Sequence, residues 1–155
     1  YIVKLLEKGW KVIIGGIPAL KYALAKKGLD NELKELLKYE DQIILPKYWI
    51  TESGEEIDIE KYDGNQKIVD ISERSAKWVG KLVEGKGIFA GPFGDTTKGY
   101  NNSLYIMDKC LAILGGDSTE LAYKHNLCKK KCLTSGGAAL AYLAGEKLPG
   151  IEALK

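Results

Sequence analysis

The residues best suited to chemistry form the run Gly115-Gly116-Asp117-Ser118, which follows a short apolar segment. Glycine has no Cβ, so the backbone N–H groups of Gly115 and Gly116 can come close to a phosphate. Asp117 supplies a hard carboxylate oxygen of the kind that Mg²⁺ prefers. Ser118 can donate its hydroxyl to a phosphate or cap the helix that follows. The run predicts a metal-phosphate site, with a plain helix-capping turn as the alternative.

Two other glycine pairs also follow short apolar segments. Gly15 and Gly16 could form a flat wall against a nucleotide base, because neither carries a side chain. Gly136 and Gly137 would let either an anion or a neighbouring helix approach closely. The first pair fits neither G-x-G-x-x-G nor G-x-x-x-x-G-K-[ST], which argues against a standard nicotinamide site and against a P-loop.

Strands and helices that could position these turns alternate along the sequence. Continuous apolar runs predict buried strands, and apolar residues three or four positions apart predict helices. Strands are expected at 11–14, 42–45, 67–70, 87–90, 111–114 and 131–135. Helices are expected at 18–27, 72–84, 101–109, 118–125 and 138–144, and another over Leu33, Leu36 and Leu37 with Asp30 or Asn31 as its cap.

This alternation predicts an α/β fold, a doubly wound, Rossmann-like three-layer sandwich formed by residues 1–155 as a single domain. Its sheet would be mainly parallel and would have about six strands. Segments 48–51 and 55–59 flank Glu52-Ser53-Gly54, which predicts a small β-hairpin insertion. Ligands of such sheets bind outside the carboxyl ends of the strands, and the glycine turns all follow strands at that edge.

The composition indicates which kinds of partner and which cellular compartment to expect. A net charge of +2 gives no general attraction for polyanions, so we expect no nucleic-acid partner. No apolar stretch approaches the roughly 20 residues of a membrane-spanning helix, so we expect no membrane partner. The three cysteines do not form a disulfide framework, which favours free thiols and a cytoplasmic location.

Two other groups of side chains have both structural and chemical interpretations. His125, Cys128 and Cys132, with a third cysteine upstream, offer a zinc set, although buried free cysteine is the commoner case. The lone histidine argues against a Ser-His-Asp hydrolase. Trp78 shares a helical face with Leu82, which predicts packing in the core or at an interface.

Four segments, taken in order, resemble one protein family. They are 88–94, 115–118, 134–138 and the closing stretch 143–154, which is the most specific of them. Together they resemble phosphoglycerate kinase, in its C-terminal, nucleotide-binding half and of an archaeal type. The resemblance covers essentially all 155 residues.

The resemblance implies a glycolytic phosphotransferase that moves a phosphoryl group between 1,3-bisphosphoglycerate and ADP. In that family the C-terminal half holds the nucleotide with Mg²⁺, as ADP or ATP. The N-terminal half holds the phosphoglycerate and is the partner of this domain. The present chain begins at Tyr1, which suggests an excised or split domain. We therefore expect the isolated chain to bind Mg-nucleotide without turning over.

The resemblance also assigns roles to single residues. Gly15 and Gly16 would flank adenine, Asp117 would hold the metal, and the amides of Gly116 and Gly136 would steady the transferring phosphoryl group. The residues placed at the nucleotide are Gly15, Gly16, Pro92, Gly115, Gly116, Asp117, Ser118 and Gly137.

Three departures from the family pattern support an alternative function. Ala90 stands where the family has asparagine, Thr97 lies near the place of its ribose-binding glutamate, and Ser135 replaces a glycine. A non-catalytic binding or scaffold domain with a decayed nucleotide site is therefore the second hypothesis.

Overall fold

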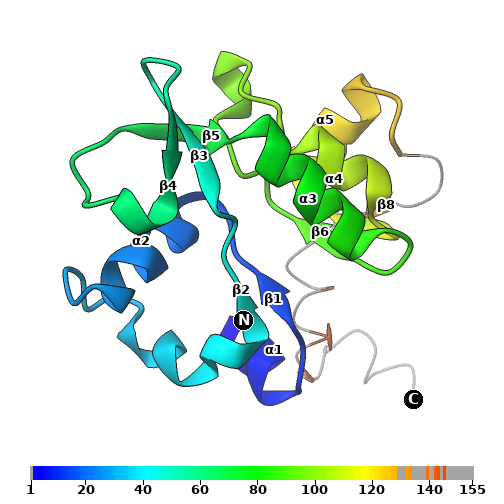
Figure 1. Cartoon of the computed structure of the whole chain (residues 1–155). Coiled ribbons are helices and arrows are strands. Elements are labelled where there is room, and N and C mark those ends of the chain that lie inside the picture. Colours follow the sequence, from blue (N-terminus) through cyan, green and yellow to red (C-terminus); the bar gives the residue numbers. More distant parts are fainter. Residues whose placement is uncertain (1, 129–131, 134–138, 140–141, 144, 146–155) are drawn as a thin grey trace.

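The computed structural model describes residues 2–128, 132–133, 139, 142–143 and 145. They form an α/β fold (Figure 1). The α-helices are α1 (Ile2–Glu7), α2 (Gly16–Lys26), α3 (Glu73–Val83), α4 (Leu104–Lys109) and α5 (Gly116–Lys124). The 3₁₀ helices are η1 (Lys34–Gln42), η2 (Ile59–Lys61) and η3 (Thr96–Lys98). The strands are β1 (Val12–Ile13), β2 (Ile43–Ile44), β3 (Tyr48–Thr51), β4 (Glu56–Asp58), β5 (Ile68–Ile71), β6 (Ile88–Ala90), β7 (Ala112–Leu114) and β8 (Cys132–Leu133).

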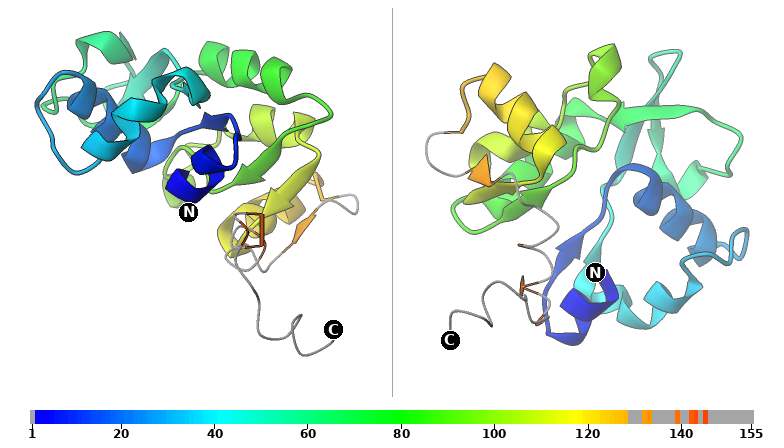
Figure 2. Two further views of the ribbon diagram at one scale, coloured as in Figure 1. Left: turned by 90° about the horizontal axis from the view of Figure 1, so that it is seen from below. Right: turned by 180° about the vertical axis from the view of Figure 1, so that it is seen from behind.

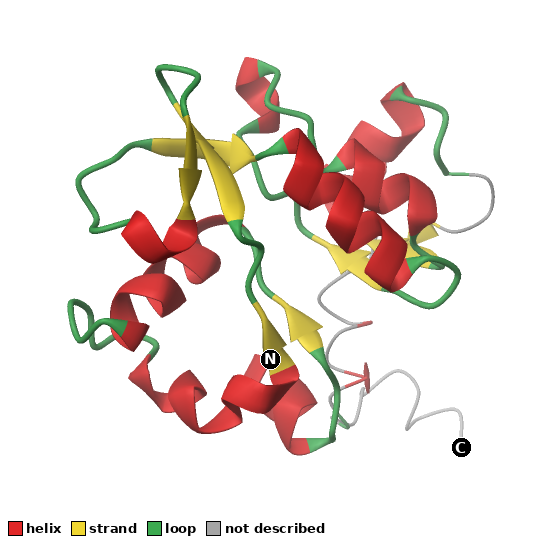
Figure 3. Ribbon diagram, viewed as in Figure 1, coloured by secondary structure: helices red, strands yellow, loops and turns green. Residues whose placement is uncertain are grey.

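The strands of the described residues form three short sheets, which Figure 3 shows as separate yellow groups. β1 and β2 are parallel, and β6, β7 and β8 form a second parallel sheet in that order. β3 is the centre of an antiparallel sheet with the order β4-β3-β5. The α/β class with parallel strands is therefore confirmed, but the expected single sheet of about six strands is not found in this part of the chain.

β5 differs most from expectation. Segment 67–70 was expected to be a parallel core strand, but β5 runs antiparallel to β3, with Ile71 opposite Trp49 and Asp70 opposite Ile50. It thus adds a third strand to the hairpin of β3 and β4, which is present as predicted. A continuous apolar run suits a buried strand of either direction, so the sequence pattern leaves the pairing direction open.

Two groups of elements share one core. In both views of Figure 2, the elements from α1 to β5 gather on one side and those from α3 onward on the other. Side chains from both groups are fully buried together, among them Trp49, Ile71, Met107 and Ile113. Within the described residues, no helix is long and apolar enough to cross a membrane.

The predicted helix caps were tested at two helices: the cap of α3 is confirmed, and the cap of η1 is wrong. Ser72 caps α3 as a serine at that position predicts, because its hydroxyl accepts from the Ser75 N–H at 3.3 Å. The expected cap at Asp30 or Asn31 is wrong, since η1 begins only at Lys34. Asp30 Oδ1 instead accepts from the Glu32 N–H at 2.7 Å, a local turn that competes with helix formation.

Trp78 is not a core residue. Its side chain is 47% exposed, whereas Trp49 is 0% exposed. Leu82 is also exposed on the same helix, α3. The prediction of core packing is therefore wrong, because the apolar face that α3 buries lies over Ala76 and Val79 instead. Packing of Trp78 at an interface stays a prediction.

Two of the three cysteines form a disulfide, which contradicts the expectation of free thiols. Cys128 and Cys132 are bonded, with their Cα atoms 5.2 Å apart, and Cys110 is buried outside any disulfide. This separation lies within the range that disulfide geometry requires. Among the described residues no three His, Cys, Asp or Glu side chains could hold a metal ion, so the zinc alternative has no support there.

Candidate functional site

One predicted glycine turn and the turn after β6 line the same cleft. Gly15 and Gly16 join β1 to α2, and Gly91 and Pro92 follow β6; all four line a cleft of about 750 Å³. A Cβ on Gly16 would lie 3.8 Å from the Pro92 carbonyl oxygen. The structure thus brings together Gly15 and Gly16, which were predicted to flank a base, and Pro92, which was predicted to lie at the nucleotide.

An aromatic cluster that the sequence did not reveal lies against this cleft. The Phe93 ring packs on Gly15 so closely that a Cβ on Gly15 would overlap it. Phe93 stacks on Trp49, with ring centroids 6.2 Å apart, and on Phe89, with centroids 6.1 Å apart. Gly15 is therefore needed because an aromatic side chain covers its backbone.

The turn of residues 91–95, called the 91–95 turn below, is held by hydrogen bonds from three directions. The Gly91 N–H donates to Ser118 Oγ at 2.9 Å, and the Phe93 N–H donates to Ser103 Oγ at 2.8 Å. The Asp95 N–H donates to the Val69 carbonyl at 3.2 Å. Because these three amides already have partners, they are not available to hold a phosphate.

Ser118 supports the turn and does not cap α5. Gly115 occupies the N-cap position of α5, and no side chain caps it. The Ser118 side chain is buried, and its oxygen accepts from Gly91 N–H. The capping role is therefore wrong, and contact of Ser118 with a nucleotide stays a prediction. Ser103, which also supports the turn, was not singled out by the sequence.

Asp70 is a buried carboxylate next to the same turn. It is 2% exposed, and it accepts from the Ile71 N–H at 2.8 Å and from the Asn102 N–H at 3.0 Å. A Cβ on Gly94 would overlap Asp70 Oδ1. Burial raises the pKa of Asp70 because it disfavours the charged form, and the two N–H groups act more weakly in the opposite direction. Its only signal in the sequence was a carboxylate at the end of an apolar run.

The predicted metal-phosphate turn lies one strand away. Gly115 joins β7 to α5 with a φ of +98°, a conformation that favours glycine. Among the described residues, none has an atom within 4 Å of a Cβ built on Gly115 or Gly116, and Gly116 is exposed. Asp117 is exposed in the first turn of α5, where helix N–H groups have no helical partner. The structure gives its carboxylate no hydrogen bond or ion pair with any described residue.

The two turns are neighbours at one sheet edge. β6 and β7 are parallel, with Ala90 opposite Leu114, so Gly91 and Gly115 each come directly after paired residues. The Gly91–Ser118 hydrogen bond joins the 91–95 turn to α5. Gly115, Gly116 and Asp117 do not line the cleft itself. Gly136 and Gly137, predicted as the second anion turn, lie outside the described residues.

Charged side chains also line the cleft. Glu52 and Lys67 form an ion pair at 2.5 Å, and the hydrogen bond from Lys67 lowers the pKa of Glu52. Asp95 also lines the cleft, and a hydrogen bond from the Thr97 hydroxyl lowers its pKa. The two carboxylates at the cleft thus come from the β3–β4 turn, which carries Glu52, and from the start of η3, which Asp95 caps. The Thr97 hydroxyl already donates to Asp95.

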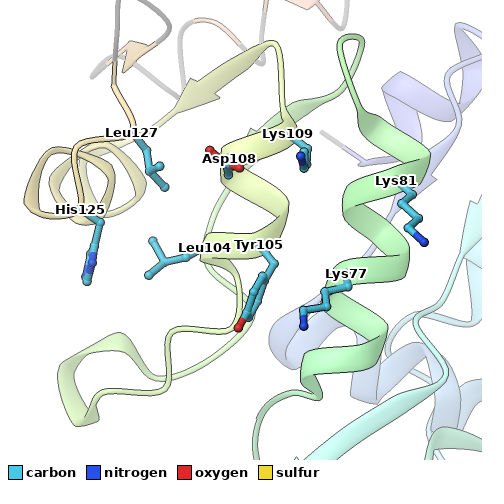
Figure 4. A pocket seen from close by; sticks show the side chains of 8 residues that line it. All are labelled: Lys77, Lys81, Leu104, Tyr105, Asp108, Lys109, His125 and Leu127. Atoms are coloured by element: carbon cyan, nitrogen blue, oxygen red, sulfur yellow. The ribbon is translucent and has the colours of Figure 1, made fainter.

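A second groove, of about 450 Å³, lies between α3, α4 and the end of α5 (Figure 4). Lys77, Lys81 and Lys109 give it a basic character. Much of that charge is compensated, since Lys77 pairs with Glu73 at 2.7 Å and Lys109 with Glu84 at 3.7 Å. Of the residues considered for a ligand, only His125 of the zinc alternative lines it, and none of those placed at the nucleotide does. The first cleft is therefore the stronger candidate.

Sequence comparison relates the chain to phosphoglycerate kinases. No family model matches it. Phosphoglycerate kinase of Borrelia duttonii is 32% identical in an alignment 184 positions long, which covers 97% of this chain and 47% of the relative. That of Pyrococcus furiosus is 30% identical and covers 96% and 45%. The chain spans about half the length of the curated relatives it matches, and these come from both bacteria and archaea.

Solved structures agree in fold. Phosphoglycerate kinase from Coxiella burnetii superposes with a TM-score of 0.78 at 22% identity, over 98% of this chain and 48% of that one. The enzyme from Pyrococcus horikoshii gives a TM-score of 0.74 at 22% identity, over 97% and 48%. The chain therefore shares the fold of about one half of these molecules.

Proposed function

We propose that this chain, which resembles one half of phosphoglycerate kinase, is the C-terminal, nucleotide-binding half of such an enzyme. The observation that carries the proposal is the pair of neighbouring turns at one sheet edge. One of them, the 91–95 turn, contributes Pro92 to a cleft that Gly16 also lines, and the other, Gly115–Asp117, has Gly116 and Asp117 exposed. The Gly91–Ser118 hydrogen bond fixes the first turn to the helix that carries the second.

In this proposal the base of ADP or ATP lies in the cleft beside Gly16 and Pro92. The phosphates extend toward the amides of Gly115 and Gly116, where the N-terminus of α5 favours negative charge. Such backbone donors act by positioning and by stabilising charge, which is the main resource in phosphoryl transfer.

Asp117 fits the role of a ligand for nucleotide-bound Mg²⁺. Its carboxylate is exposed beside the open turn and has no protein partner within the described residues. Mg²⁺ usually binds through one or two carboxylates together with phosphates and water, so a single carboxylate suffices here. When bound, the ion would neutralise charge on the phosphates.

The whole enzyme would transfer a phosphoryl group between 1,3-bisphosphoglycerate and ADP in the cytoplasm. The other half would hold the phosphoglycerate, so this chain alone would bind Mg-nucleotide without turnover. The chain spans 47% of the length of one curated relative, so the proposal assigns to it about one half of such an enzyme.

Calorimetric titration with Mg-ADP tests the proposal. We expect wild type to bind, and Asp117→Ala to bind at least about tenfold more weakly because a charged metal contact is lost. Glu120→Ala is the matched control, since Glu120 is an exposed acid on the same helix. Absence of binding by wild type would refute the proposal, and equal affinity of Asp117→Ala would refute the metal role alone.

The second candidate is a non-catalytic binding or scaffold domain. It is favoured by the Phe93 ring over Gly15, which fills space at the wall expected to meet a base. Mixing this chain with a separately expressed N-terminal half of a phosphoglycerate kinase separates the two candidates. Recovered turnover, measured by ATP formation, would exclude a decayed site, whereas nucleotide-free association would support a scaffold.

A further inference from the structure

The Cys128–Cys132 disulfide lies beside the Gly115–Gly116 turn in the fold. Cys128 follows α5, the helix that begins at Gly116, and Cys132 opens β8, the strand that pairs with β7. Each cysteine is next to a residue that is hydrogen-bonded to the turn: Cys132 precedes Leu133, and Cys128 contacts Thr119. The disulfide therefore ties together two separate supports of the same turn.

The first support is β8. Cys132 pairs with Ile113 of β7, and the next residue, Leu133, accepts a hydrogen bond at 2.9 Å from the Gly115 N–H. β8 is only two residues long, and among the described strands it pairs with β7 alone. A covalent bond at Cys132 restrains this strand.

The second support is Thr119 on α5. Its N–H donates to the Gly115 carbonyl at 2.9 Å, and its hydroxyl donates to the Gly116 carbonyl at 3.1 Å. The sulfur of Cys128 lies 3.7 Å from the Thr119 carbonyl oxygen. A reduced Cys128 thiol can donate to that oxygen, so the reduced state also has a partner for its polar group.

We propose that Cys128 and Cys132 are a redox-sensitive modification site that sets the rigidity of the Gly115–Gly116 turn. In the oxidised protein the disulfide restrains β8 and α5 relative to one another. In the reduced protein this covalent restraint is lost, β8 depends on its non-covalent contacts with β7 and α5, and the hydrogen bond of the Gly115 N–H breaks more often. We further expect this change to alter the affinity for a nucleotide, an expectation that rests on the proposed function.

The reaction is exchange with a dithiol reductant. Its thiolate attacks the sulfur of Cys132, because Cys132 is partly exposed whereas Cys128 is 7% exposed. The S–S bond breaks, Cys128 leaves as a thiolate and takes up a proton, and a mixed disulfide forms at Cys132. The second thiol of the reductant then displaces Cys132, so two electrons pass to the protein and the reductant becomes a disulfide. A cytoplasmic disulfide of this kind is more often redox-sensing than structural.

Amide hydrogen exchange at Gly115, followed by NMR in oxidised and dithiol-reduced protein without nucleotide, tests the inference. We expect exchange at Gly115 to be about tenfold faster after reduction, because local opening governs exchange. Cys132→Ser should exchange at the fast rate in both conditions. Cys110→Ser is the matched control, since its disulfide is intact and it should respond as wild type does.

Two results would overturn the inference. One is equal exchange at Gly115 in oxidised and reduced wild type, a comparison that needs no variant. The other is three alkylatable thiols in protein equilibrated with a disulfide oxidant. Titration of the oxidised and the reduced protein with Mg-ADP separates the two proposals. If neither state binds, the proposed function is refuted. A change in hydrogen exchange at Gly115 would then still support the redox site.

Discussion

At the scale of single residues, Ser103, Ser118 and Asp70 hold the 91–95 turn from three separate elements. Ser103 and Ser118 each accept from one amide of the turn, and Asp70 lies against Gly94. Buried hydroxyls and carboxylates with backbone partners fix a turn more firmly than exposed ones, because an unmade buried bond is costly. These three residues therefore help to fix the turn that carries Pro92.

Asp70 gives a pH-dependent prediction. Its pKa is raised in the folded protein, so the folded state binds this proton more tightly than the unfolded state does. The contribution to stability is complete below the ordinary aspartate pKa and is lost as pH rises through the raised pKa. We expect the free energy of unfolding of wild type, relative to Asp70→Asn, to fall as pH rises through this window.

Urea unfolding of both proteins across the acidic and neutral range measures this difference, and contributions of other carboxylates cancel in it. Asp70→Asn should also be less stable by about 1–3 kcal/mol at neutral pH, because its amide NH₂ cannot accept from a backbone N–H. Parallel pH curves for the two proteins would contradict the prediction.

At the scale of elements, the β1–α2 junction and the 91–95 turn pack through Gly15 and Phe93. Gly15 has a φ of −139°, which any residue adopts, so alanine there would be excluded by the Phe93 ring and not by the backbone. We expect Gly15→Ala to lower the free energy of unfolding by about 1–3 kcal/mol through overpacking. In a Phe93→Ala background the same substitution should cost much less.

Chemical denaturation of the two single variants and the double variant measures this coupling. Gly116→Ala serves as the control for stability, since a Cβ there would meet no described residue within 4 Å. Additive effects of Gly15→Ala and Phe93→Ala would show that the ring does not impose the requirement for glycine.

At the scale of the whole molecule, one core joins the elements before β5 to those after it. Trp49 lies at its centre and donates from its indole N–H to the Pro46 carbonyl at 2.8 Å. Trp78, in contrast, is exposed on α3. The two tryptophans therefore differ in what they contribute to folding.

We expect Trp49→Ala to destabilise the protein by about 3–5 kcal/mol, the usual cost of removing a buried aromatic side chain. Trp78→Ala should change the free energy of unfolding by less than about 1 kcal/mol, as exposed substitutions do. Thermal and urea unfolding of both variants tests the pair, and a similar loss for both would contradict the placement of Trp78 at the surface.

The sequence alone determined the order of the elements, the hairpin and the position of the described glycine turns after strands. These features follow from local causes: hydrophobic periodicity, and glycine where the backbone needs a positive φ, as at Gly115. It also placed Asp117 at the start of a helix, where the structure has it.

Only the tertiary structure decided the rest. The antiparallel direction of β5, the bond from Gly91 to Ser118 across 27 positions, and the Cys128–Cys132 disulfide each depend on how segments meet in space. Local sequence patterns do not specify such tertiary contacts. A buried strand, a serine hydroxyl or a cysteine thiol can pair equally well with several partners. The choice among them is made by the packing of the whole chain.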